Sequence, residues 1–255
     1  MKKLFLSVII VVLAVLIVVA VIGVGLFLDS IVKTGMETVG PKITQVSIKV
    51  NAVNLSLLTG SAKVKGLVVG NPEGYKTTQA ISVGSAAVGV NPFSVFSDKI
   101  VVRSVRVEAP EITFEGGLGG NNLSKIMDNV NAIAQNGGPA STNTTAQAGN
   151  EPGRKIEVDD FLITGAMVHV SLTGVGGKEM TLPLPDIHLT NLGKDSAGIT
   201  ATDLTRRVLG AITTATIKAV AGATTDIGQR AGKAAGEGMN KITSGLGGLF
   251  KKSTN

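Results

Sequence analysis

Residues 99–115, KIVVRSVRVEAPEITFE, indicate most clearly how this chain folds. Val105 and Val107 alternate with charged residues, and Ile112 and Phe114 alternate with glutamate and threonine. Such a two-residue period is typical of strands with one apolar and one polar face. Antiparallel sheets commonly bury one face and expose the other. The stretch therefore predicts part of an antiparallel sheet with a single apolar side.

The same alternation covers residues 45–115 and returns in residues 154–172. Asn71-Pro72 and Asn91-Pro92 contain strong turn formers and are expected to separate the strands. Residues 154–172 are interpreted as a hairpin. Two shorter strands are expected in residues 179–182 and 186–189.

The hairpin aligns without gaps with the earlier stretch. Lys155 matches Lys99, Ile163 matches Val107, and Val168 matches Ile112. One interpretation is an internal repeat. The other is that any two amphipathic hairpins would align equally well.

Two segments have helical periodicity instead. In Asn122–Ala134, apolar residues recur at three- and four-residue steps, and Asn121 or Asn122 can cap the start. A second helix is expected from Thr200 to Ala221, with an interruption at Gly222. Residues 135–153 have almost no apolar side chains, and this composition predicts a mobile loop.

The N-terminus has the pattern of a membrane anchor. Lys2 and Lys3 precede an uncharged run from Leu4 to Leu28, which Asp29 ends. As a helix the run would be about 37 Å long, enough to cross a hydrocarbon core of about 30 Å. A cleaved signal has a shorter apolar core, so residues 1–28 are interpreted as an uncleaved signal anchor, with a cleaved signal as the alternative. Positive flanks stay in the cytoplasm, so the rest of the chain is expected outside it.

The net charge of +6 is concentrated in the C-terminal region, residues 199–255. A basic amphipathic helical region suits an anionic membrane surface, although a solvated face is the simpler interpretation. The candidate membrane-surface residues are Arg206, Arg207, Lys218, Arg230, Lys233, Lys241, Lys251 and Lys252. Nucleic acid is not an expected partner, because the chain carries no recognition motif and few aromatic residues for base stacking.

The sequence offers little for catalysis. The chain has no Cys, which excludes thiol chemistry, disulfides and cysteine-based metal sites. Asp186 and His188 would face the same side of a strand, but spacing alone is weak evidence for a relay or a metal site. The glycine-rich stretch 116–120 lacks the Lys-Ser/Thr of a phosphate-binding loop. We therefore predict neither an enzyme nor a bound metal or cofactor.

Several stretches resemble the AsmA-like family of bacterial envelope proteins over roughly residues 1–210. The resemblance lies in 66–72 (GLVVGNP), the strand pair 100–110, Asn122-Leu123 and 184–189 (LPDIHL), after a single N-terminal span. It implies a curved antiparallel sheet with an apolar concave face. It also implies a role in phospholipid transport and outer-membrane assembly, without catalytic residues. The extended mid-section of long family members is missing here.

The expected fold is α+β: an N-terminal transmembrane helix, then a curved antiparallel β-domain (residues 29–198) whose apolar face is partly covered by amphipathic helices. The candidate lipid-facing residues are Val46, Ile48, Val88, Val90, Val105, Val107, Ile112, Phe114, Ile156, Val158, Val168 and Val170. The expected function is binding or handing on phospholipid acyl chains in the bacterial inner membrane, with the bulk of the chain periplasmic. Other envelope proteins are possible partners through the sheet edges. The alternative is a scaffold or assembly adaptor that binds no lipid.

Overall fold

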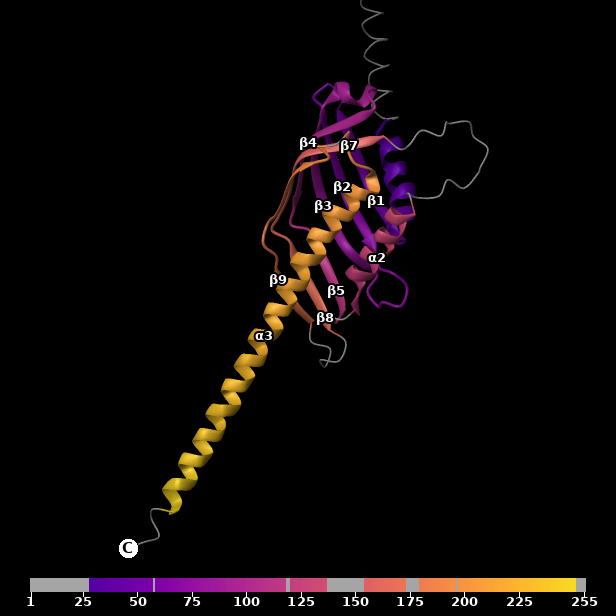
Figure 1. Ribbon diagram of the computed structural model, residues 1–255. Coiled ribbons are helices and arrows are strands. Elements are labelled where there is room, and N and C mark those ends of the chain that lie inside the picture. The colour runs from indigo at the N-terminus through magenta and orange to yellow at the C-terminus, as the bar shows by residue number, and fades with distance from the viewer. Residues whose placement is uncertain are drawn as a thin grey trace, which may run out of the picture.

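The computed structural model describes residues 28–56, 58–117, 120–136, 154–172, 179–195 and 197–250, with the side chains of 226–250 left out. It shows one large, mostly antiparallel sheet with helices packed against it, so the predicted α+β class is confirmed (Figure 1). The predicted N-terminal span, apart from Leu28, lies outside the described residues.

The strands are β1 (Ile48–Ser56), β2 (Ser61–Gly70), β3 (Gln79–Val90), β4 (Lys99–Glu108), β5 (Glu111–Gly117), β6 (Gly120–Asn121), β7 (Lys155–Thr164), β8 (Met167–Leu172), β9 (Glu179–Pro183) and β10 (Ile187–Leu192). The helical elements are residues 28–44, the short 3-10 helix η1 (Pro92–Phe96), α2 (Asn122–Gln135) and α3 (Ala201–Phe250).

Three pairs of consecutive strands lie end to end rather than side by side. β4 and β5 both pair antiparallel with β3, and the same register continues from one to the other apart from a shift at Gly89/Val90. β7 and β8 pair with β4 and β5, also in one continuous register, but parallel. β10 and β9 continue the pattern along β7 and β8. In the sheet, the pairs β4–β5, β7–β8 and β10–β9 therefore each occupy the place of one long strand, and each is interrupted between its two members.

The hairpin interpretation of residues 154–172 is therefore wrong. Between β4 and β5, Ala109 has a φ of 46°, and at the matching position Gly165 has a φ of 63°. These left-handed residues bend their strands without reversing them, so each line resumes on the same neighbour. The two bends lie beside each other, because Ala109 N–H donates to the carbonyl of Thr164 at 2.8 Å.

The sheet is mostly antiparallel, as expected, but two strand pairs depart from this pattern. β4 pairs parallel with β7, and β5 pairs parallel with β8. The partners are the residues that the sequence alignment matches: Lys99 lies opposite Lys155, and Ile112 opposite Val168. Parallel neighbours need a long crossover connection, and the segment that contains α2 supplies it.

The helices begin where the caps predict, but α3 does not end where expected. Asn121 caps α2 by accepting a hydrogen bond from Ser124 N–H at 2.9 Å, and Thr200 accepts one from Asp203 N–H at 3.0 Å at the start of α3. The predicted interruption at Gly222 is wrong, since α3 continues through it to Phe250. Figure 1 shows α3 crossing the sheet and projecting beyond it. One glycine costs a helix about 1 kcal/mol, and the packing of Val220, which is buried two residues earlier, offsets this cost.

The helix over residues 28–44 covers the edge strand β1. Glu37 Oε1 accepts a hydrogen bond from Val50 N–H at 2.8 Å, and Asp29 Oδ1 accepts one from Leu55 N–H at 2.7 Å. Lys33 Nζ donates to the Asn51 carbonyl at 3.2 Å. An unpaired edge strand can form hydrogen bonds with a strand of another chain. By covering β1, this helix blocks such pairing.

Candidate functional site

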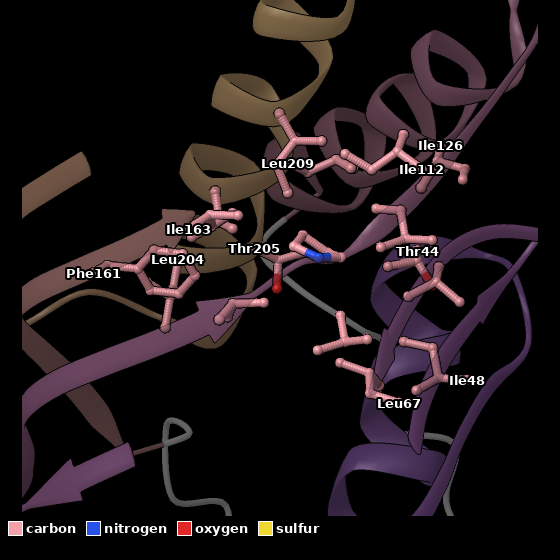
Figure 2. A pocket seen from close by; sticks show the side chains of 17 residues that line it. Thr44, Ile48, Leu67, Ile112, Ile126, Phe161, Ile163, Leu204, Thr205 and Leu209 are labelled. Carbon is pink, nitrogen blue, oxygen red and sulfur yellow. The ribbon is translucent and has the colours of Figure 1, made fainter. Parts of the chain in front are cut away.

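An apolar cavity of about 280 Å³ lies between the sheet and α3. The lining residues are almost all aliphatic, with one phenylalanine, and Figure 2 shows ten labelled members around a common space. They are Thr44, Ile48, Leu67, Val69, Ile81, Val83, Val107, Pro110, Ile112, Ile126, Phe161, Ile163, Leu204, Thr205, Val208, Leu209 and Ile212.

The cavity exists because the helices cover the bent sheet incompletely. β2 and β3 contribute Leu67 and Val83 from one side, and the first turns of α3 contribute Leu204 and Leu209 from the other. α3 packs on α2, β7, β9 and β10. The lining residues of β2 and β3 lie across the cavity from it. Leu67 and Leu204 are only half-buried, which places part of the lining at the surface.

The described lining offers no free side-chain hydrogen-bond donor. Its only polar side chains are two threonines, and both hydroxyls already have acceptors. Thr44 Oγ1 donates to the Gly40 carbonyl at 2.9 Å, and Thr205 Oγ1 donates to the Ala201 carbonyl at 2.8 Å. A polar ligand would lose its water contacts here without replacement. The cavity therefore suits a hydrocarbon.

The predicted lipid-facing residues divide into three groups. Those that line the cavity are Ile48, Val107 and Ile112. Those that the chain itself buries elsewhere in the core are Val46, Phe114, Val158, Val168 and Val170. Those that lie half-buried on the sheet without lining the cavity are Val88, Val90, Val105 and Ile156.

Four of the predicted lipid-facing residues lie elsewhere for reasons that the structure shows. Phe114, Val168 and Val170 do not line the cavity; they are at most 1% exposed and share a core cluster with Leu123 and Val130 of α2, so they are ordinary core residues. Val46 lies before β1, between the N-terminal helix and the strand, and is not a strand residue.

Sequence reasoning missed most of the cavity wall. Leu67 and Val69 lie in β2, and Val208 and Ile212 lie on the predicted second helix. The apolar stripe of α3 is visible in the sequence, but it predicts only a cover for the sheet and not a wall of a cavity. Thr44 belongs to the helix over 28–44, which was not predicted, although Val32, Met36 and Ile43 show its spacing.

The histidines and acids of the sequence lie outside the cavity. His188 bonds to Asp160, with 2.5 Å between Nε2 and Oδ1, and Arg106 pairs with the other oxygen of that carboxylate. Hydrogen bonds from His188 and then Arg106 hold the pKa of Asp160 below its usual value. Asp186 does not pair with His188; it lies with Lys218 beside a second hollow next to α3. No cluster that could hold a metal occurs among the described residues.

The predicted basic residues are only partly described. Arg206 forms an ion pair with Asp203 at 2.9 Å, while Arg207 and Lys218 are exposed on α3. Arg230, Lys233 and Lys241 lie on the part of α3 whose side chains are not described, and Lys251 and Lys252 lie outside the described residues. The membrane-surface role of this region stays a prediction.

Comparison with known proteins gives no family for this chain. No family model matches it, and no curated protein matches it. Among the described residues, Ala201–Thr225 is long and apolar enough to span a membrane, but a core helix passes the same test. Leu209, Ile212 and Val220 of this stretch are buried against the rest of the protein, so it is weak evidence for a span.

Proposed function

We propose that this protein binds the acyl chain of a membrane lipid in the cavity between the sheet and α3, without catalysing a reaction. The observation that carries this proposal is the apolar cavity itself, whose described lining contains no charged residue and no unpaired hydroxyl. An unbranched hydrocarbon needs only dispersion contacts and the exclusion of water, and such a lining provides both.

The size of the cavity limits what enters. An apolar cavity of about 150 Å³ takes up one benzene ring, so 280 Å³ has room for roughly ten carbon atoms. Sites for whole drug-sized ligands measure about 300–1,000 Å³. The ligand is therefore the end of one acyl chain, and the headgroup stays outside.

The cellular context of the proposal comes from the sequence. An uncharged run of 25 residues after Lys2 and Lys3 favours an anchor in the bacterial inner membrane, with the body on the periplasmic side. The resemblance to AsmA-like proteins favours phospholipid as the ligand and envelope assembly as the process. A cavity for part of one chain fits a protein that holds a lipid locally and passes it on.

The second candidate is a scaffold or assembly adaptor that binds no lipid. It is favoured by the buried cluster around Phe114, Val168 and Val170, where the chain fills its own concave face. The two candidates differ in one respect: the scaffold needs no ligand in the cavity.

Photochemical labelling separates the two candidates. The full chain is reconstituted in vesicles that contain a phosphatidylethanolamine with a diazirine near the end of one acyl chain. After irradiation, labelled peptides are identified by mass spectrometry. We expect label on β3, β4 and residues 204–212, at least about tenfold above the turn 71–77, because burying a few methylenes concentrates the chain by that factor.

A pair of substitutions controls for the fold. Val83→Phe places a ring in the cavity and should abolish the label there, since Val83 lines it. Val39→Phe makes the same change at an exposed position of the N-terminal helix and should leave the label unchanged. Equal labelling in both variants, or no label on the lining in the unchanged protein, would favour the scaffold.

A further inference from the structure

Two large apolar side chains project from the protein almost fully exposed. Leu58, in the turn between β1 and β2, is 87% exposed, and Phe93, at the start of η1, is 84% exposed. Single exposed apolar residues are common on protein surfaces. Leu58 and Phe93 lie more than thirty positions apart in the sequence. What matters is therefore whether the fold places their segments side by side.

Both side chains lie at the same end of the sheet. Val90, the last residue of β3, donates its N–H to the carbonyl of Gly60 at 2.6 Å, which joins the β1–β2 turn to the start of η1. Gly60 has a φ of 63°, and a Cβ there would overlap the Val90 carbonyl and the ring of Pro92. The fold thus holds the segments that carry Leu58 and Phe93 tightly together.

The N-terminal helix starts at this same end. Asp29 Oδ1 bonds to Leu55 N–H at the end of β1, whereas Glu37 bonds to Val50 N–H nearer its beginning. The helix and β1 therefore run in opposite directions. β1 runs from Leu55 toward Leu58 at this end of the sheet. The first residue of the helix, Leu28, lies toward the same end, and the uncharged run of the sequence ends there.

We infer that this end of the sheet rests on the membrane that holds the N-terminal anchor, with Leu58 and Phe93 inserted into the lipid. The apolar run Leu4–Leu28 joins the body directly at Asp29, and Asp29 is fixed to β1 without an intervening linker. Ile31, two residues further along the helix, is also 48% exposed. This inference rests on the anchor prediction and not on a ligand in the cavity.

The contact is apolar rather than electrostatic. Asp98 is exposed just after η1 and Lys99 pairs with Glu157, but Lys155 lies opposite Lys99, so this end carries charges of both signs beside its two apolar side chains. Aliphatic and aromatic side chains gain free energy by entering the acyl boundary of a bilayer. We therefore expect insertion that is insensitive to salt and to the fraction of anionic lipid. A basic surface would respond to both.

The chain contains no Trp, so a single introduced Trp reports on one position. Phe93→Trp and Leu58→Trp variants of the full chain are reconstituted in phosphatidylethanolamine–phosphatidylglycerol vesicles. These vesicles contain lipids brominated near the glycerol end of the acyl chains. We expect a blue-shifted emission and at least about twofold quenching for both variants, because a side chain at the acyl boundary lies among the bromines.

Glu73→Trp is the matched control. Glu73 is exposed in the turn between β2 and β3, at the other end of β2 from Leu58. β2 has 10 residues, which separates the two turns by about 30 Å. Trp at position 73 should emit as in water and escape quenching. The inference is overturned if all three positions are quenched alike, if none is quenched, or if quenching at 58 and 93 falls as salt is raised.

Discussion

Glu115 shows how one buried carboxylate fixes a connection between distant segments. Its two oxygens accept hydrogen bonds from Lys76 N–H at 2.7 Å and from the N–H and hydroxyl of Thr77 at 2.9 and 2.6 Å. Burial alone would raise the pKa of Glu115, but these hydrogen bonds outweigh it and lower the pKa. Burial, and then the charge of Glu115, raises the pKa of neighbouring Tyr75.

The buried amide of Asn122 extends this network. Its Nδ2 donates to Asn71 Oδ1 at 2.8 Å and to the Thr113 carbonyl at 2.7 Å, while its Oδ1 accepts from Glu115 N–H at 3.0 Å. Asn71 and Asn122 are far apart in the sequence, and the fold brings their side chains into contact. Their role here is to hold the β2–β3 turn and the start of α2 on the sheet.

Glu115→Gln should destabilise the protein at neutral pH by about 1–3 kcal/mol, because a neutral amide accepts these hydrogen bonds less well and adds a competing donor. A folded pKa below the unfolded value of about 4.3 means that the carboxylate stabilises the fold above that pH. This contribution is lost as the pH falls through the folded pKa. Urea unfolding at pH 7 and near pH 3 measures both free energies.

The difference between the unchanged protein and Glu115→Gln should therefore shrink in acid. Glu111→Gln is the matched control, since Glu111 is exposed at the start of β5. A Glu115→Gln effect as small as the Glu111→Gln effect at pH 7 would show that the network contributes no stability.

At the scale of elements, the helix over residues 28–44 determines whether β1 is free to pair with another strand. Glu37→Ala should release the Val50 N–H, and amide hydrogen exchange at Val50 should become about tenfold faster or more. Glu37→Gln keeps a carbonyl oxygen in the same place and should restore most of the protection. Exchange at Val50 that is equally slow in both variants would mean that the helix does not protect this edge.

The type of each element could be predicted from the sequence more easily than its partners. The alternation of Val105 and Val107 specifies a strand with one buried face, and the spacing of Leu123 and Ile126 specifies α2. Periodicity does not encode whether the chain reverses after Ala109, because a left-handed residue before a proline can make a turn or a bend. The parallel partners were visible only as the alignment of 99–115 with 154–172.

For the same reason, only part of the cavity lining could be predicted from the sequence. Alternation identifies which residues face the concave side, but whether a helix covers each one depends on the path of α3 across the sheet. Phe114 and Ile112 have the same pattern in the sequence and lie on the same face. α2 fills the space over Phe114, while Ile112 also borders the cavity.

At the scale of the whole molecule, the bent sheet, α2 and α3 surround a cavity. Its described lining contains no charged residue, and its volume is too small for a complete lipid. Under the proposed function, an acyl chain would enter with its methyl end first, and its ester would stay outside the apolar lining. With room for roughly ten carbons, the lining contacts only the distal part of a chain. This depth limit can be measured by moving the photoreactive group along the chain.

A series of phosphatidylethanolamines, each with the diazirine at a different carbon, should label the cavity only from the distal positions. Probes within roughly the last ten carbons should label Val69 and Val208, which line the cavity and are only half-buried, whereas probes beside the ester should label no lining residue. Labelling that does not depend on the position of the diazirine would contradict a cavity that holds one chain end. Val83→Phe should shift the limit toward the methyl end or remove the label, because the added ring occupies the volume that the terminal carbons would fill.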